Sequence, residues 1–135
     1  MLHQEIAALT QQAQRRMQTG NLPEAKALYG QICQLNRDNA EAWMMLGALS
    51  GELGSPEEAI SCLRTAIVLQ PNFPKAHYNL GNVLRGRGEL HEALECFERA
   101  VALDPGYVEA WRASAGVHLM LDGLEQAESC CRRAV

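Results

Sequence analysis

Aromatic residues and long apolar runs are scarce in this sequence. Only 5% of its 135 residues are aromatic, and no window approaches the roughly 18 consecutive apolar residues that a membrane-spanning helix requires. The first residues, MLHQE, contain no basic segment followed by an apolar stretch, so they do not indicate a secretory signal. We therefore expect a cytoplasmic protein with no membrane partner.

Basic residues are also few. The chain has 12 Lys+Arg against 16 Asp+Glu and a formal net charge of -4. Binding to nucleic acid requires a basic face that neutralises several phosphates, whereas the pairs Arg15-Arg16 and Arg132-Arg133 are isolated. We therefore expect no nucleic-acid partner. With 47% apolar residues the chain can still bury a core, which argues against disorder along its whole length.

The sequence has no recognisable metal-binding or catalytic pattern. No CxxC pair is present, and Cys62, Cys96 and Cys130 are spaced evenly along the chain. Equivalent places in packed helices lie at least about 8 Å apart, which exceeds the roughly 7 Å Cα separation that a disulfide tolerates. We therefore interpret the cysteines as reduced packing residues, and His77 and His118 as packed histidines. We predict no enzyme activity, no cofactor and no metal site within these residues.

A period of 34 residues organises the chain. A large side chain recurs at Trp43, His77 and Trp111. Small, apolar, turn-forming and proline positions recur in the same phase: Gly47, Gly81 and Ala115; Ala25, Ala59, Ala93 and Ala127; Tyr29, Leu63, Phe97 and Cys131; Gly20, Gly54, Gly88 and Asp122; and Pro71 with Pro105, where Arg37 stands in the first copy. We predict a break between two helices at each position of the glycine column, including Asp122.

Each copy has the pattern of a helical hairpin. In residues 40–53 the apolar or small positions follow the i, i+3, i+4, i+7 spacing of one buried helix face. Ser55 and Pro56 then provide a helix cap and a first-turn proline. No segment alternates with the period of two that is typical of a strand. The pattern predicts a single all-α array of stacked antiparallel helix pairs, with copies at about 6–39, 40–73, 74–107 and 108–135, the last one truncated.

This pattern resembles the tetratricopeptide repeat (TPR) over essentially the whole chain. The third copy is nearest, with His77-Tyr78-Asn79-Leu80-Gly81, then Ala93, Phe97, Ala100 and Pro105. The resemblance implies a solenoid that coils into a right-handed superhelix, with the first helix of each copy lining the inner surface. It also implies a protein-interaction scaffold. The segment from Asn79 to Asn82 is similar to the arrays of O-GlcNAc-transferase-like proteins, where stacked asparagines contact the substrate backbone.

The inner surface carries residues that suit an extended peptide. Methionines adapt to apolar ligands, amides hydrogen-bond a peptide backbone, and cations meet carboxylates. The candidate peptide-binding residues are Gln11, Gln14, Met44, Met45, Lys75, Tyr78, Asn79, Asn82, Arg85 and Arg112. The alternative interpretation is that these are ordinary exposed helix positions, with the methionines partly packed between copies.

Family members that clamp the acidic tails of heat-shock chaperones need Lys and Asn where this sequence has Met44 and Ala48. They need a further cationic pair where it has Glu109 and Ala113. We therefore do not expect a chaperone-tail clamp, although Asn79 fits the middle role of such a clamp.

Three functions remain open from the sequence. The first is a scaffold that binds an extended peptide or a helix on the concave face. The second is the substrate-recruiting arm of a larger, glycosyltransferase-like transferase located beyond Val135. The third is a self-assembling module, because Ala127, Cys131, Ala134 and Val135 form an apolar end that the usual polar capping helix does not cover. The same end suggests a fragment of a larger protein.

Overall fold

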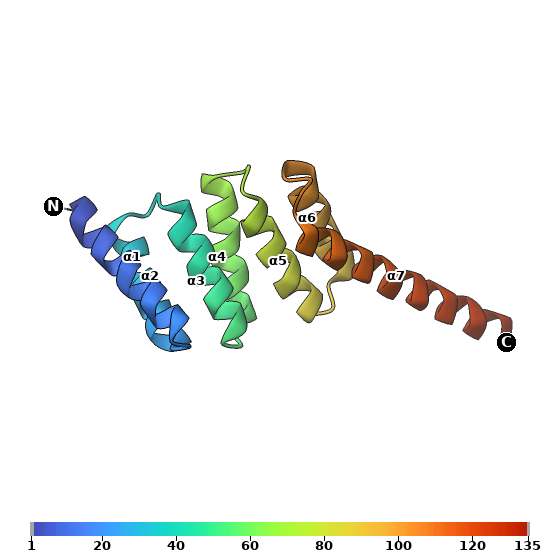
Figure 1. Ribbon diagram of the computed structural model, residues 1–135. Helices are drawn as coiled ribbons and strands as arrows, with labels where there is room; N and C mark the ends of the chain where they lie inside the picture. The colour runs from blue at the N-terminus through green and yellow to red at the C-terminus, as the bar shows by residue number, and fades with distance from the viewer. Residues whose placement is uncertain (1, 135) are drawn as a thin grey trace.

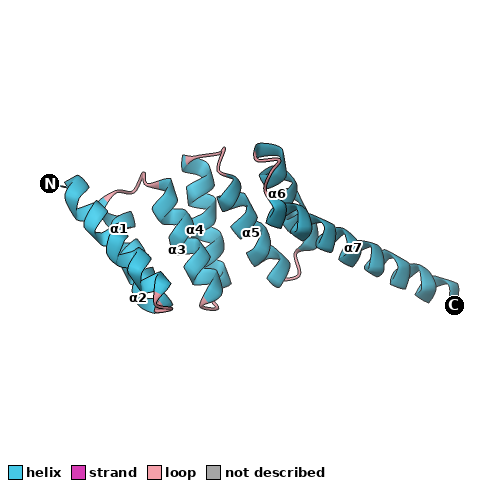
Figure 2. Ribbon diagram, in the orientation of Figure 1, coloured by secondary structure: helices cyan, strands magenta, loops and turns pink. Residues whose placement is uncertain are grey.

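The computed structural model describes residues 2–134, with side chains described for residues 2–124. Over this range the chain forms seven helices and no strand (Figures 1 and 2): α1 Leu2–Gln18, α2 Leu22–Leu35, α3 Ala40–Glu52, α4 Pro56–Leu69, α5 Pro74–Gly86, α6 Leu90–Leu103 and α7 Val108–Ala134. α1 packs on α2, α3 on α4 and α5 on α6, and each pair contacts the next. The predicted all-α array of stacked helix pairs is confirmed.

The turn inside each of the first three pairs depends on a glycine with positive φ. These glycines are one period apart, with φ of 80° at Gly20, 84° at Gly54 and 82° at Gly88. In the second pair the N–H of Gly54 bonds to the carbonyl of Gly51, and the N–H of Ser55 bonds to the carbonyl of Ser50 at 2.8 Å. This pattern is the Schellman C-cap, in which a residue without a Cβ ends the helix at no steric cost.

The predicted break at Asp122 is wrong. α7 runs without interruption through this position, so the fourth copy is one long helix within the described residues. The reason is steric: a residue with a Cβ pays about 1 to 2 kcal/mol to enter the left-handed conformation. The side chains of Ala127, Cys131 and Ala134, and Val135 as a whole, lie outside the described residues. The division of the chain into four copies stays a prediction.

A repeated hydrogen bond joins each of α3, α5 and α7 to the loop that precedes it. Trp43 donates its indole Nε1–H to the carbonyl of Arg37 at 2.9 Å, and Trp111 donates to the carbonyl of Pro105 at 2.8 Å. His77 Nε2 lies 2.9 Å from the carbonyl of Pro71, and because a carbonyl only accepts, this nitrogen carries the proton. The large side chains of Trp43, His77 and Trp111 therefore anchor the starts of α3, α5 and α7. His77 is satisfied, as predicted.

The small residues Gly47 and Gly81 allow the two helices of a pair to approach closely. A Cβ added at Gly47 would lie 2.7 Å from Leu63 Cγ, and one added at Gly81 would lie 2.6 Å from Phe97 Cε1. Leu63 and Phe97 are both fully buried. In these two pairs the large side chain of the second helix therefore fills the space above a glycine of the first.

We predict that Gly81→Ala lowers the free energy of unfolding. The new methyl group overlaps the Phe97 ring, which costs about 1 to 3 kcal/mol and outweighs the roughly 1 kcal/mol that alanine gains over glycine in a helix. The control is Gly30→Ala inside α2, where an added Cβ meets nothing within 4 Å and only the gain applies. Urea denaturation measures both, and equal stability of the two variants would contradict the packing argument.

We predict that His77→Phe destabilises the array and that His77→Trp does not. Phenylalanine removes the donor to the Pro71 carbonyl, at a cost of about 0.5 to 1.5 kcal/mol. Tryptophan restores the donor in the way that Trp43 and Trp111 provide it. The midpoint of urea denaturation reports the difference, and identical midpoints for the two variants would show that the hydrogen bond contributes nothing.

Candidate peptide-binding groove

A groove of about 440 Å³ lies between α3 and α5, on the face formed by the first helices of the pairs. Ala48 and Gly51 line it from α3, and Gly86 lines it from α5. The groove is open because these side chains are small or absent. Asn79 and Asn82, both candidate binding residues, also line it. Two of the predicted amides therefore line one groove.

The prediction that Met44 contacts a ligand is wrong. Its side chain is only 2% exposed and belongs to the core, so it is not a surface contact for a ligand. The Asn79 amide Nδ2 lies 3.2 Å from Met44 Sδ, across the contact between α3 and α5. The alternative interpretation of packing between copies holds here, because the neighbouring helix covers a position that is free on an isolated helix.

Arg85 and Tyr78 are half-buried and already engaged with their neighbours. Arg85 donates from Nη2 to Asn82 Oδ1 at 2.9 Å, and its guanidinium lies 5.5 Å from the Phe97 ring centroid. The ring centroid of Tyr78 lies 5.8 Å from that of Phe97 and 5.0 Å from that of Tyr107. Arg85 therefore orients the Asn82 amide, and Tyr78 contributes to packing between α5 and its neighbours.

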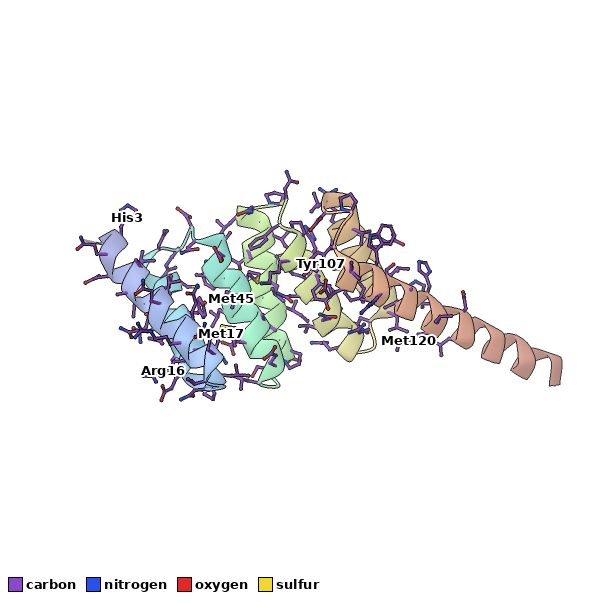
Figure 3. The ribbon with its side chains drawn as sticks, in the orientation of Figure 1. His3, Arg16, Met17, Met45, Tyr107 and Met120 are labelled. Carbon is purple, nitrogen blue, oxygen red and sulfur yellow. The ribbon has the colours of Figure 1, made fainter. Side chains whose placement is uncertain are left out.

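The other candidate residues lie away from the groove. Gln11 and Gln14 are exposed on α1, and Arg112 is exposed on α7. Lys75 lines a separate hollow with Tyr107, and Met45 is half-buried against the core. Figure 3 labels Met45 and Tyr107, which lie in different parts of the array. The structure therefore does not bring all ten predicted residues into one site.

The groove also contains residues that the predicted site does not include. Arg87 follows α5 in the turn, where the spacing of a helical face gives no signal, and Val83 is an apolar residue that the predicted binding set leaves out. Glu52 carries the acidic charge of the groove. Its place on the inner face of α3 follows from the helical spacing, so the sequence could have supplied this residue.

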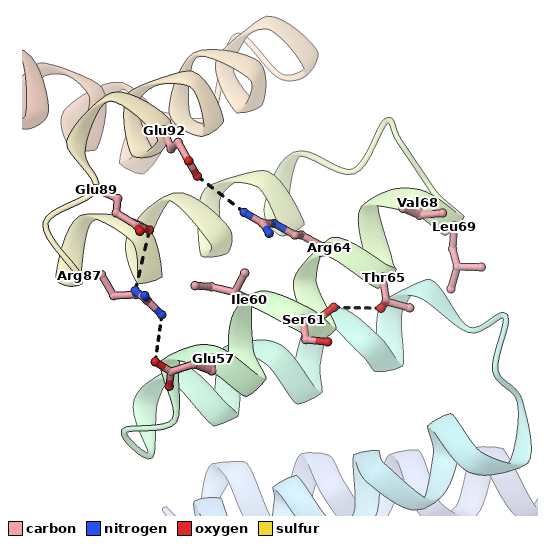
Figure 4. Close-up of a pocket in the computed structure, with 10 residues that line it drawn as sticks. All are labelled: Glu57, Ile60, Ser61, Arg64, Thr65, Val68, Leu69, Arg87, Glu89 and Glu92. Atoms are coloured by element: carbon pink, nitrogen blue, oxygen red, sulfur yellow. Dashed lines mark hydrogen bonds and ion pairs between the residues drawn. The ribbon is translucent and has the colours of Figure 1, made fainter.

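A second groove of about 700 Å³ lies on the opposite side of the pairs, between α4 and the start of α6 (Figure 4). Ile60 and Val68 supply apolar surface to it. Arg87 pairs with Glu57 at 3.1 Å, and Arg64 approaches Glu92 at 3.7 Å. Arg87 therefore lines both grooves, while its charge is directed to the acids of the outer one. Nothing in the sequence pattern predicts this groove.

The environment of His118 differs from the predicted one. His118 is exposed, and its Nε2 lies 3.7 Å from Glu98 Oε1, so the prediction of a packed histidine is wrong there. Within the described residues α7 contacts only α5 and α6, and no second helix covers it at that point. Among the described residues no cluster of His, Cys, Asp and Glu is arranged to hold a metal ion. Within the same residues no helix has the length and apolarity needed to cross a bilayer.

The described cysteines are free thiols that serve as packing residues. Cys33 and Cys62 are buried and Cys96 is half-buried. Burial, together with the neighbouring thiol of Cys62, raises the pKa of Cys33 to about 12. Burial and the nearby carboxylates of α6 raise the pKa of Cys96 to about 11. The thiols therefore stay protonated in the folded protein at neutral pH. The side chains of Cys130 and Cys131 lie outside the described residues.

We predict that ionisation at Cys33 weakens the fold in alkali. The unfolded chain releases this proton near the ordinary pKa of 9.0, whereas the folded chain holds it until about 12. The Cys33 contribution is therefore fully present below pH 9 and is lost as the pH rises towards 12. In reducing buffer the free energy of unfolding of Cys33→Ala should decline less over this window than that of the parent protein. Parallel declines would contradict the assignment.

Two family models match parts of the array. The tetratricopeptide repeat model matches residues 74–107, and a second TPR repeat model matches residues 51–86. Human tetratricopeptide repeat protein 7A is 36% identical over 70 residues, which are 52% of this chain and 8% of that protein.

Solved structures agree with these matches. An O-GlcNAc transferase mutant from Thermobaculum terrenum superimposes with a TM-score of 0.83 at 31% identity, over 87% of this chain and 22% of that chain. The second TPR domain of human RPAP3, solved in complex with an HSP70 peptide, gives a TM-score of 0.81 at 21% identity, over 87% of this chain and 98% of that chain.

The described residues therefore have the fold of an all-α tetratricopeptide-repeat solenoid. The similarity of the array to that of an O-GlcNAc transferase, expected from the third copy, is also confirmed. The chain spans less than a quarter of the length of that transferase and less than a tenth of the curated human relative.

Proposed function

We propose that this array is a protein-interaction scaffold whose α3–α5 groove holds an extended segment of a partner protein. The observation that carries the proposal is the pair Asn79 and Asn82, which lines a groove walled by small residues. Residues three apart on a helix lie about 5 to 6 Å from each other. Two residues of an extended chain advance by about 6.6 Å, so successive amides suit alternate peptide units.

The amide chemistry supports recognition of a peptide backbone. A carboxamide offers both a donor and an acceptor, as a peptide unit does. The guanidinium of Arg85 occupies one acceptor site of Asn82 at 2.9 Å and so fixes the direction of this side chain. A ligand then meets an oriented group and loses less entropy on binding.

The carboxylate chemistry of chaperone tails is not supported by the residues. An RPAP3 domain of the same fold is bound to an HSP70 peptide, but at 21% identity this likeness carries the fold alone. In the present chain Met44 and Ala113 are buried, and Ala48 presents only a methyl group. None of the three offers a charged or amide group to a carboxylate. The proposed ligand is therefore an extended peptide held by its backbone.

We predict that Asn82→Ala weakens the binding of a peptide selected from a displayed random library against the intact chain. Loss of one hydrogen-bonding side chain costs about 1.4 kcal/mol, which is a factor of about ten in Kd. The control is Arg64→Ala on α4, which lines the outer groove and should leave the Kd unchanged. Fluorescence anisotropy measures both. Weakening by Arg64→Ala with no effect of Asn82→Ala would place the peptide in the outer groove and refute the proposal.

A second candidate function is the substrate-recruiting arm of a larger transferase. It is favoured by the 31% identity to the Thermobaculum terrenum O-GlcNAc transferase over 87% of this chain. The mass of the native gene product tests it, with peptide sequencing beyond Val135. A product well above 14.9 kDa with a transferase domain would support this role. A product of about that mass would remove it while leaving the peptide groove in place.

A further inference from the structure

One end of the α3–α5 groove is bordered by the C-terminal ends of both helices. Gly51 and Glu52, the last two residues of α3, line the groove, and so does Gly86, the last residue of α5. The C-terminal end of a helix carries a partial negative charge, because the dipoles of its peptide units align along the axis. Both walls of the groove therefore present negative potential at this end.

Glu52 adds a full negative charge at the same place. Its side chain is exposed, and among the described residues it forms no ion pair. The helix that carries it contains no lysine or arginine. A carboxylate at the C-terminal end of a helix is repelled by the helix dipole. The position of Glu52 is therefore unfavourable in the chain alone and becomes favourable when a cation binds beside it.

Arg87, the cation among the residues that line the groove, is already balanced. Its Nη1 lies 3.1 Å from Glu57 Oε1, and its Nε lies 3.9 Å from Glu89 Oε2, so two carboxylates share one guanidinium. Pro56 at the start of α4 also lines the groove, but Glu57 and Glu58 offset the positive end of that helix. This end of the groove therefore keeps an excess of negative charge.

Arg85 does not reverse this balance, because its side chain is directed away from the groove. It donates to Asn82 Oδ1 at 2.9 Å, and its guanidinium lies 5.5 Å from the ring centroid of Phe97 on α6. Asn82 lines the groove, whereas Arg85 does not. Arg85 therefore orients an amide of the groove without supplying a cation to it.

The wall that leads to Glu52 is apolar and made of small residues. Ala48 and Gly51 line it from α3, and Val83 faces them from α5. Ala48 lies one helical turn before Glu52, which is roughly 6 Å along the axis. Lysine and arginine pack an apolar stem along such a surface and carry their charge at its end. This combination of a small apolar wall and a terminal carboxylate therefore fits a long cationic side chain.

We propose that the segment held in the α3–α5 groove carries a lysine or an arginine whose cation pairs with Glu52. The inference rests on the proposed function and adds the class of partner, which is a basic extended segment rather than an acidic tail. The backbone of this segment meets Asn79 and Asn82, while its cationic side chain runs past Ala48 to the end of α3. An acidic side chain at this place meets the same negative potential and is rejected.

The test uses the full chain and a peptide selected against it from a displayed random library. We expect this peptide to contain a lysine or arginine whose replacement by glutamine weakens binding about two- to fivefold, and more at low ionic strength. Glu52→Gln should weaken binding of the original peptide equally and should abolish the difference between the two peptides. Glu52→Lys should reverse the preference, so that a peptide with glutamate in place of the basic residue binds this variant better.

The matched control is Glu41→Gln, which removes the same charge from the first turn of the same helix, outside the groove. It should leave the Kd unchanged. Urea denaturation should show Glu52→Gln to be at least as stable as the parent chain, because its carboxylate opposes the helix dipole. A loss of stability in Glu52→Gln would reveal a partner within the fold and would overturn the proposal.

The failure of this inference differs from the failure of the proposed function. If Asn82→Ala weakens binding and Glu52→Gln does not, the groove binds a peptide but does not select a cation, and only this inference falls. If neither substitution has an effect, the peptide binds elsewhere and both fall. A selected peptide that contains no basic residue, or equal weakening by Glu41→Gln and Glu52→Gln, would also overturn the assignment of Glu52.

Discussion

The close contact between a glycine of one helix and a large side chain of the next is the constraint on which the array depends. Gly81 admits the Phe97 ring and Gly47 admits Leu63, and no Cβ fits at either position without displacement. This contact sets the separation of the helices in a pair. The turn glycines then set how the two helices of a pair are joined, and the rings of Trp43 and His77 fasten α3 and α5 to the loops that precede them. Stability therefore comes both from the contacts within each pair and from the contacts between successive pairs.

Much of this architecture could be predicted from the sequence because it repeats. Small residues that recur every 34 positions indicate where two helices approach closely, and glycines that recur at the same interval indicate turns with positive φ. The same reasoning fails at Asp122. This residue falls at the position of the turn glycines, but it carries a Cβ, which disfavours the positive φ that the turn requires. His118 fails for a related reason, since its column is buried only where a second helix covers it.

The site was predicted less completely than the fold. Helical spacing identifies the faces of an isolated helix, which suffices for Asn79 and Asn82. It cannot show that α5 closes over Met44, because that contact depends on how successive pairs approach. It also gives no information on Arg87 in a turn. Arg87 lies between the inner groove and the acids of the outer one, so its charge is balanced before any ligand arrives.

The partner-binding surface that we propose is the α3–α5 groove. The most direct measurement is an NMR titration of the ¹⁵N-labelled chain with a selected peptide, followed through the side-chain amides of Asn79 and Asn82. We predict that these resonances move together with the backbone signals of Ala48 and Gly51. Shifts confined to Ile60, Arg64 and Val68, with unchanged asparagine amides, would show that the partner binds the outer groove and would contradict the account.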